Sequence, residues 1–172
     1  FNAVQNSKAK KDLISPFVSA LRKKDLKVGL YYSLPDWTYE DYTHHTRKII
    51  RYKVNEQPER WNHFLNYSYS QMKELSSNFN PDLLWFDGDW TDYWTLEDGD
   101  DLYQYIRELK PDIIINNRVS KRKIFKKDFG TPEQFAPDSK LKHYWEACYT
   151  MNDSWGFKIK DNDWKSPEVV YE

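Results

Sequence analysis

The segment Leu83–Trp90, with the sequence LLWFDGDW, constrains the fold of this chain more than any other. Four apolar residues in succession indicate a strand buried on both faces, as in a parallel sheet covered by helices. Asp87 follows directly, and α/β folds carry their functional groups at the carboxyl ends of parallel strands. Gly88 lets the backbone turn away and leaves the carboxylate at the mouth of the sheet. By itself this segment also fits an aspartate that caps the next helix or turn.

Helical and strand patterns alternate along the chain, which predicts an α/β fold with a parallel sheet. Helices are expected over residues 8–24, with a kink or a restart at Pro16, from Pro58 to a break at Asn80, and over residues 102–109. Strands are expected over residues 26–32, 83–87, 113–115 and 144–148.

Polar or reactive residues follow each of these strands, as in a (β/α)₈ barrel, whose site is assembled from several strand ends. A doubly wound fold that binds dinucleotides would carry a glycine-rich first turn, and this sequence has none. A whole barrel takes about 250 residues, whereas this chain has 172. The sequence therefore predicts a partial barrel, with residues 1–172 as a fragment of one catalytic domain.

The composition argues against several classes of function. Net charge is −1 with both signs interspersed, so no basic face for nucleic acid is expected. No apolar run is long enough to predict a membrane span. The four histidines lack metal-ligand spacing and Cys148 is the single cysteine, so neither a metal nor another cofactor is expected. Aromatic residues make up 17% of the chain and are frequent in the long segment 33–57, which favours a flat, polar ligand such as a carbohydrate.

Three carboxylates follow predicted strands or lie near them: Asp87, Glu133 and Glu146. Two carboxylates that face each other across an aromatic-rimmed cleft are typical of glycosidases, in which one is the nucleophile and the other the general acid/base. A module that binds sugars without catalysis would also use the aromatic residues. Such modules are commonly β-sandwiches, which the alternation of helix and strand does not predict.

Seven motifs cover nearly the whole chain: Phe1–Val4, Val28–Leu34 followed by Trp37, Leu84–Gly88, Ile115–Arg118, Thr131–Gln134, Trp145–Cys148 and Ser154–Phe157. In this order they resemble pieces of family 29 glycoside hydrolases, the α-L-fucosidases. The Trp-Phe-Asp-Gly and Thr-Pro-Glu-Gln motifs carry most of the resemblance. That family consists of retaining enzymes that remove terminal α-L-fucose through a covalent intermediate on a (β/α)₈-like barrel.

The resemblance implies that Asp87 is the nucleophile and that Glu133 is the acid/base, with Glu146 as its rival. Arg118 resembles an arginine that contacts the sugar beside the nucleophile. The aromatic residues expected to line the pocket are Tyr32 (or Tyr31, because the strand parity is open), Trp37, Trp90, Trp94 and Trp155.

Parts of the family pattern lie outside these residues. The resemblance implies that the N-terminal barrel strands with the fucose-binding histidines precede Phe1 and that a C-terminal β-sandwich domain follows the matched region. We therefore expect the remaining barrel, and possibly this second domain, as partners, and we expect the chain alone to be inactive. The resemblance implies a fucosylated oligosaccharide or glycoconjugate as substrate and a periplasmic, extracellular or lysosomal location.

Overall fold

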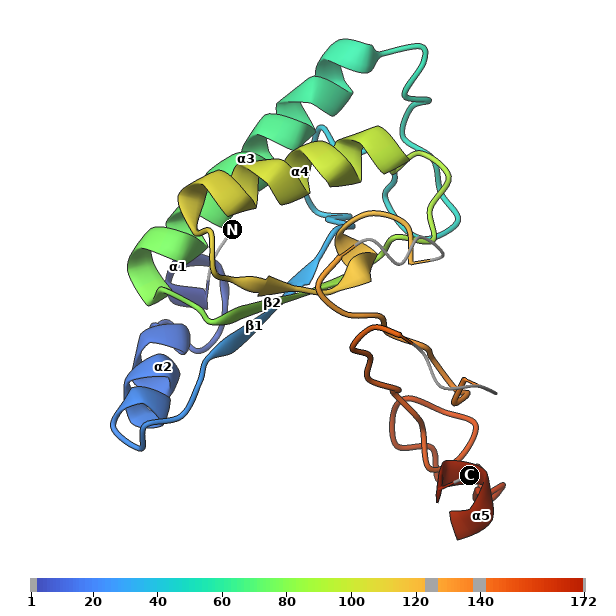
Figure 1. Ribbon diagram of the computed structural model, residues 1–172. Helices are drawn as coiled ribbons and strands as arrows, with labels where there is room; N and C mark the ends of the chain where they lie inside the picture. Colours follow the sequence, from blue (N-terminus) through green and yellow to red (C-terminus); the bar gives the residue numbers. More distant parts are fainter. Residues whose placement is uncertain (1–2, 123–126, 138–141, 172) are drawn as a thin grey trace.

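The computed structural model describes residues 3–122, 127–137 and 142–171. A parallel sheet of three strands lies at its centre (Figure 1) in the order β1 (Gly29–Ser33), β2 (Leu83–Asp87) and β3 (Ile114–Ile115). Ser33 pairs with Asp87, and Leu84 pairs with Ile115. The parallel pairing confirms the predicted α/β class, and all three strands point their carboxyl ends to the same edge.

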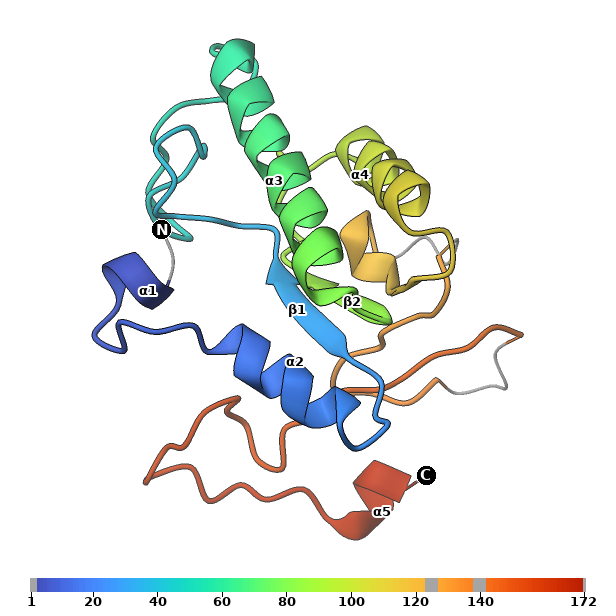
Figure 2. The same ribbon diagram turned by 90° about the vertical axis from the view of Figure 1, so that its left-hand side faces the viewer.

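Two long helices, α3 (Pro58–Phe79) and α4 (Leu96–Leu109), cover one face of the sheet (Figures 1 and 2). Leu84 and Phe86 of β2 point into this layer and are 0% exposed, whereas Trp85 on the other face is only half-buried. The expectation that β2 is buried on both faces is therefore wrong. The second face of β2 is open among the residues that the structure describes, and Trp85 and Asp87 lie on it.

The helix boundaries follow from local capping. α3 begins at Pro58, where the missing N–H has no helical partner, and ends before Asn80, which has a left-handed φ of 44°. α4 begins six residues earlier than expected because Thr95 and Asp98 form a capping box. Gly99 allows α4 to approach the 3₁₀ turn η1 (Asn117–Val119) closely, since a Cβ atom there would collide with Ser120.

The expected helix over residues 8–24 is shorter in the structure and has no kink. Only α2 (Ile14–Arg22) lies in this range. The single-turn α1 (Ala3–Asn6) precedes it. Asp12 accepts the backbone N–H of Ile14 at 2.9 Å, which fixes the start of α2. Pro16 then falls in the first turn, where its missing N–H costs nothing. The apolar face of α2 remains open, with Phe17 56% exposed.

The expected fourth strand at residues 144–148 is not regular. Single parallel bridges join Asn116 to Phe129, Gly130 to Trp145 and Glu133 to Cys148. Pro132 has no N–H to donate, and Gln134 has a left-handed φ of 64°, so the ladder is interrupted. The bridges nevertheless continue the order of the sheet past β3. The chain then runs through loops to α5 (Pro167–Tyr171).

Many of the aromatic residues stabilise the fold instead of lining a ligand surface. Tyr42 from segment 33–57 is 1% exposed and packs on Trp61, with a ring-centroid distance of 6.2 Å. Its hydroxyl lies 2.8 Å from that of Tyr93, and Trp61 packs edge-on against Trp94. The expectation that the aromatic excess marks a binding surface is therefore wrong for this cluster. Within the described residues, no helix combines the length and apolarity that a membrane crossing needs.

Asp82 joins α2 to the sheet, and its titration should be visible in stability. Its carboxylate accepts a hydrogen bond from the backbone N–H of Val28 at 2.8 Å and forms an ion pair with the Arg22 guanidinium at 2.5 Å. These contacts lower the pKa of Asp82 to about 2. Because the folded pKa lies below the unfolded one, this stabilisation is present above about pH 4 and is lost as the pH falls through about 2.

We therefore expect Asp82→Asn to lower the free energy of unfolding at pH 6 by about 1 kcal/mol, allowing for solvent screening. At pH 3 the difference between wild type and variant should be clearly smaller. Urea denaturation of the full-length protein at both pH values measures it. The exposed Asp112→Asn is the control and should leave the free energy of unfolding at pH 6 unchanged. A constant difference between pH 6 and pH 3 would contradict the role of the carboxylate.

Candidate active site

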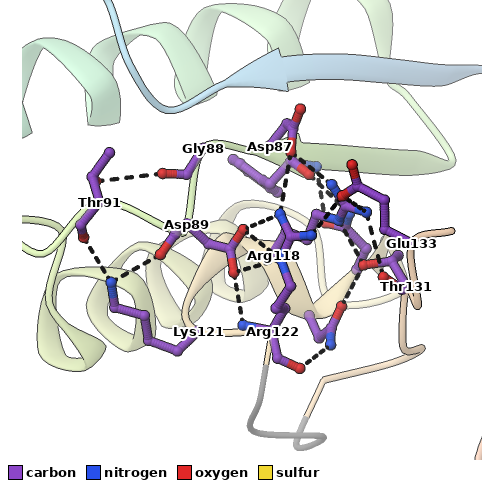
Figure 3. A network of polar contacts seen from close by, with 12 residues as sticks. Asp87, Gly88, Asp89, Thr91, Arg118, Lys121, Arg122, Thr131 and Glu133 are labelled. Atoms are coloured by element: carbon purple, nitrogen blue, oxygen red, sulfur yellow. Dashed lines mark hydrogen bonds and ion pairs between the residues drawn. The ribbon is translucent and has the colours of Figure 1, made fainter. Parts of the chain in front are cut away.

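A cavity of about 650 Å³ opens at the carboxyl ends of the strands, on the face that the helices leave uncovered. The side chains at its polar floor form one connected network (Figure 3). The cavity is lined by Tyr31, Arg47, Trp85, Asp87, Trp90, Arg118, Arg122, Glu133, Cys148 and Trp155.

Asp87 is held at the cavity by contacts to both carboxylate oxygens. Oδ1 accepts a hydrogen bond from Nη1 of Arg118 at 2.8 Å, and Oδ2 accepts one from the Tyr31 hydroxyl at 2.9 Å. Burial and the contact with Asp87 raise the pKa of Tyr31 to about 12, so its hydroxyl remains a donor at neutral pH. Gly88 has a φ of 108°, and a Cβ atom there would collide with Pro35. The glycine is thus needed for the turn that presents Asp87.

Arg118 connects the two candidate catalytic carboxylates. It follows β3 in the turn η1, is 2% exposed, and lies 2.8 Å from Asp87 and 3.1 Å from Oε2 of Glu133. Its Nε donates to the Thr131 hydroxyl at 2.7 Å, and its guanidinium lies 4.7 Å from the ring centroid of Trp85. Because an arginine side chain stays charged at all relevant pH values, this contact places a fixed positive charge beside the Asp87 carboxylate.

Glu133 enters the cavity from the extended segment after Gly130. Its Oε2 also accepts a hydrogen bond from Nη1 of Arg122 at 2.7 Å. Both arginines therefore bind the same oxygen, and Oε1 has no partner among the residues that the structure describes. The side chain is 30% exposed, so solvent and a ligand can reach it.

Glu146 lies outside this cavity. It lines an adjacent groove of about 530 Å³ together with Leu83 and Trp145. Its Oε1 accepts the indole N–H of Trp85, the residue that forms a wall of the cavity. The structure thus brings Asp87 and Glu133 together through Arg118 and gives Glu146 a contact with a cavity wall.

The aromatic predictions have mixed outcomes. Trp90 and Trp155 line the cavity. Tyr31 does so instead of Tyr32, whose hydroxyl donates to Gln71 of α3 at 2.6 Å on the opposite face of β1. The prediction that Tyr32 lines the pocket is therefore wrong, and its alternative, Tyr31, lines the cavity. Two further expected residues do not line the cavity: Trp37, which is 46% exposed, and Trp94, which is 2% exposed and donates to the Val119 carbonyl.

Three charged residues of the site were missed by the sequence reasoning. Asp89 is 2% exposed and contacts Arg122, which in turn contacts Glu133. Arg47 reaches the cavity from the segment closed by the antiparallel bridge between His44 and Ile50. For Asp89, its position two residues after Asp87 in the same turn was the one feature of the sequence that could have indicated a role in the site. Arg122 belongs to a basic segment whose pattern equally fits a solvated loop.

The arrangement fits a nucleophile paired with an acid/base. One carboxylate is fixed by a buried cation and a hydroxyl, and the other keeps one oxygen free to carry a proton. Two such carboxylates in one partly aromatic cavity can act on opposite sides of a glycosidic bond. Within the described ranges, no cluster of three or more His, Cys, Asp or Glu side chains is arranged to hold a metal ion.

Comparison with known proteins agrees with this chemistry. The chain is 26% identical over 155 residues to tissue α-L-fucosidase of Bos taurus, covering 86% of this chain and 31% of that protein. It is 27% identical over 172 residues to plasma α-L-fucosidase of Pongo abelii, covering 92% and 34% of the two chains. The chain thus spans about a third of the length of these curated relatives.

Solved structures give the same result. The α-L-fucosidase of Lactobacillus casei in complex with its α-L-fucose product superposes with a TM-score of 0.70 at 26% identity, covering 99% of this chain and 55% of that one. The model of the family described as alpha-L-fucosidase matches residues 1–172, the entire sequence. This chain therefore belongs to the α-L-fucosidase family.

Proposed function

We propose that the full-length protein hydrolyses terminal α-L-fucose from fucosylated oligosaccharides or glycoconjugates with retention of configuration. The observation that carries this proposal is the Arg118 guanidinium, which joins Asp87 and Glu133 within one cavity. The L. casei relative with fucose bound supports the choice of sugar. Fucose lacks the 6-hydroxyl group, and the aromatic cavity wall offers an apolar surface for its methyl group.

In the first step, an oxygen of Asp87 forms a bond to the anomeric carbon of fucose as the bond to the leaving oxygen breaks. Glu133, protonated on Oε1, gives that proton to the leaving oxygen, so the aglycone departs as a neutral alcohol. Arg118 stabilises the charge of Asp87 before attack.

In the second step, water attacks the anomeric carbon of the fucosyl ester. Its proton passes to Oε1 of Glu133, the ester bond breaks, and Asp87 regains its negative charge. Fucose leaves in its original configuration, and Glu133 is again protonated for the next cycle. Retention needs carboxyl groups about 5–5.5 Å apart, a spacing that two carboxylates bound to one guanidinium can adopt.

We further propose that this chain is one part of a (β/α)₈ barrel whose remaining strands complete the sugar pocket. The parallel sheet and the exposed apolar face of α2, including Ile14 and Phe17, support this. The chain alone should then be inactive, and a C-terminal β-sandwich domain would be a further partner. Similarity to a plasma fucosidase supports an exported protein.

Incubation of the full-length protein with 4-nitrophenyl α-L-fucoside tests the function. We expect nitrophenol release and, by proton NMR at early times, α-L-fucose as the first product. An aryl β-L-fucoside is the matched control and should not be cleaved. If the β-anomer of fucose appears first, the double-displacement mechanism is excluded, and if no substrate is cleaved, the protein is not a fucosidase.

A further inference from the structure

Asp89 is the second acid of the Asp87-Gly88-Asp89 turn, and it is almost fully buried at 2% exposure. Its carboxylate accepts three hydrogen bonds from Arg122: from Nη2 at 2.7 Å, from Nε at 3.0 Å and from the backbone N–H at 2.9 Å (Figure 3). The Lys121 ammonium group donates to its backbone carbonyl at 2.8 Å. A buried carboxylate with this many charge-assisted contacts holds its partner in one orientation.

Arg122 is fixed by this contact and extends to the catalytic carboxylates. Its Nη1 donates to Oε2 of Glu133 at 2.7 Å, and its Nη2 lies 3.7 Å from Oδ1 of Asp87. The guanidinium group also lies 5.6 Å from the ring centroid of Trp90. Burial lowers the pKa of Arg122, but the hydrogen bonds to Asp89 and Glu133 more than offset it, so the net shift is upward. The guanidinium therefore remains charged.

We propose that Arg122, held by Asp89, is a positioning residue that orients Glu133 for proton transfer. This inference rests on the proposed function. Because Arg118 and Arg122 both bind Oε2, the proton is carried on Oε1, the oxygen without a partner among the described residues. Arg122 acts through Glu133 and needs no contact with the substrate.

The Asp87–Asp89 turn thereby positions both catalytic carboxylates. Asp87 belongs to the turn itself, and Asp89 positions Glu133 through Arg122, although Glu133 lies 46 residues away from Asp87 in the sequence. Glu133 needs this support because its own segment is joined to the rest of the sheet by single bridges only. A displacement of about 1 Å at such a group can cost about 100-fold in rate.

The test is Arg122→Met in the full-length protein, assayed with two substrates. Proton donation matters greatly for a poor leaving group and little for an activated one. We expect kcat/KM for a fucosyl-N-acetylglucosamine disaccharide to fall about 100-fold, and kcat/KM for 2,4-dinitrophenyl α-L-fucoside to fall less than about threefold. Arg122→Lys, which retains a cation, should recover part of the loss.

Arg60→Met is the matched control. Arg60 has the same side-chain exposure as Arg122, 26%, and is likewise paired with an aspartate, Asp41, but it does not line the cavity. Both substrates should be hydrolysed by this variant at the wild-type rate. If Arg122→Met does not fold, as judged by circular dichroism, Asp89→Asn replaces it and should show the same preference with a smaller loss.

An equal loss for both substrates, or no loss for the disaccharide, overturns the role of Arg122. Glu133→Ala is measured in parallel to separate this from a failure of the proposed function. If Glu133→Ala shows the leaving-group dependence and Arg122→Met does not, the positioning role alone fails. If Glu133→Ala does not show it, the assignment of Glu133 fails, and the positioning role is overturned with it.

Discussion

Replacing Asp87 by Asn in the full-length protein should lower kcat for α-L-fucosides by about 10⁴-fold or more. The amide cannot form the fucosyl ester, and no other carboxylate among the described cavity residues is held by both Arg118 and Tyr31. The fold should persist, because Arg118 keeps its contacts with Thr131 and Glu133. Steady-state kinetics and thermal unfolding of the purified variant measure the two effects.

A fluorinated fucosyl donor should trap the ester on Asp87, and peptide mapping locates the label. Asp92→Asn is the control, because Asp92 lies five residues away on the exposed surface and should be dispensable. A label on Asp89 or Asp92 would assign the nucleophile elsewhere and contradict the proposed mechanism.

Glu133→Ala should lower kcat/KM for unactivated fucosides by about 10²–10⁴-fold while sparing activated aryl fucosides. Azide should then restore the second step, because it attacks the fucosyl ester without needing a general base. Since azide approaches from the face opposite Asp87, the product should be the α-linked fucosyl azide. Its configuration is read by NMR.

Glu146→Ala is the matched comparison. Glu146 contacts the indole of Trp85, so its loss should disturb the cavity wall, raise KM and lower kcat, with no response to azide. If azide rescues Glu146→Ala and leaves Glu133→Ala unchanged, the roles of the two glutamates are exchanged.

The elements that the sequence predicted best are those with strong local signals. The apolar run before Asp87 predicted β2, and Pro58 and Asn80 mark the ends of α3 as expected. The weakest prediction was the fourth strand at residues 144–148, where interrupted pairing leaves single bridges. A local pattern of apolar residues cannot show whether a neighbouring segment offers a continuous set of partners.

The parity of β1 shows the same limit for a single residue. Tyr31 and Tyr32 are adjacent and chemically identical, and only one can face the cavity. The contact of Tyr32 with Gln71 of α3 directs Tyr31 to Asp87. That choice depends on where α3 packs, because the residue that binds Tyr32 lies 39 residues later in the chain. The sequence of the strand alone does not indicate this contact.

The sequence by itself determined the parallel α/β class and placed Asp87 at a strand end, because an apolar run closed by an acid and a glycine is a local signal. Only the tertiary structure decided which distant charges meet there. Asp89 follows β2, Arg122 follows β3, and Glu133 lies on the bridged segment beside β3, so all three meet at the carboxyl edge of the sheet. The ion pairs of Arg122 with Asp89 and with Glu133 join residues 33 and 11 positions apart in the sequence. These separations match no helical or strand periodicity, so the sequence pattern could not predict the two pairs.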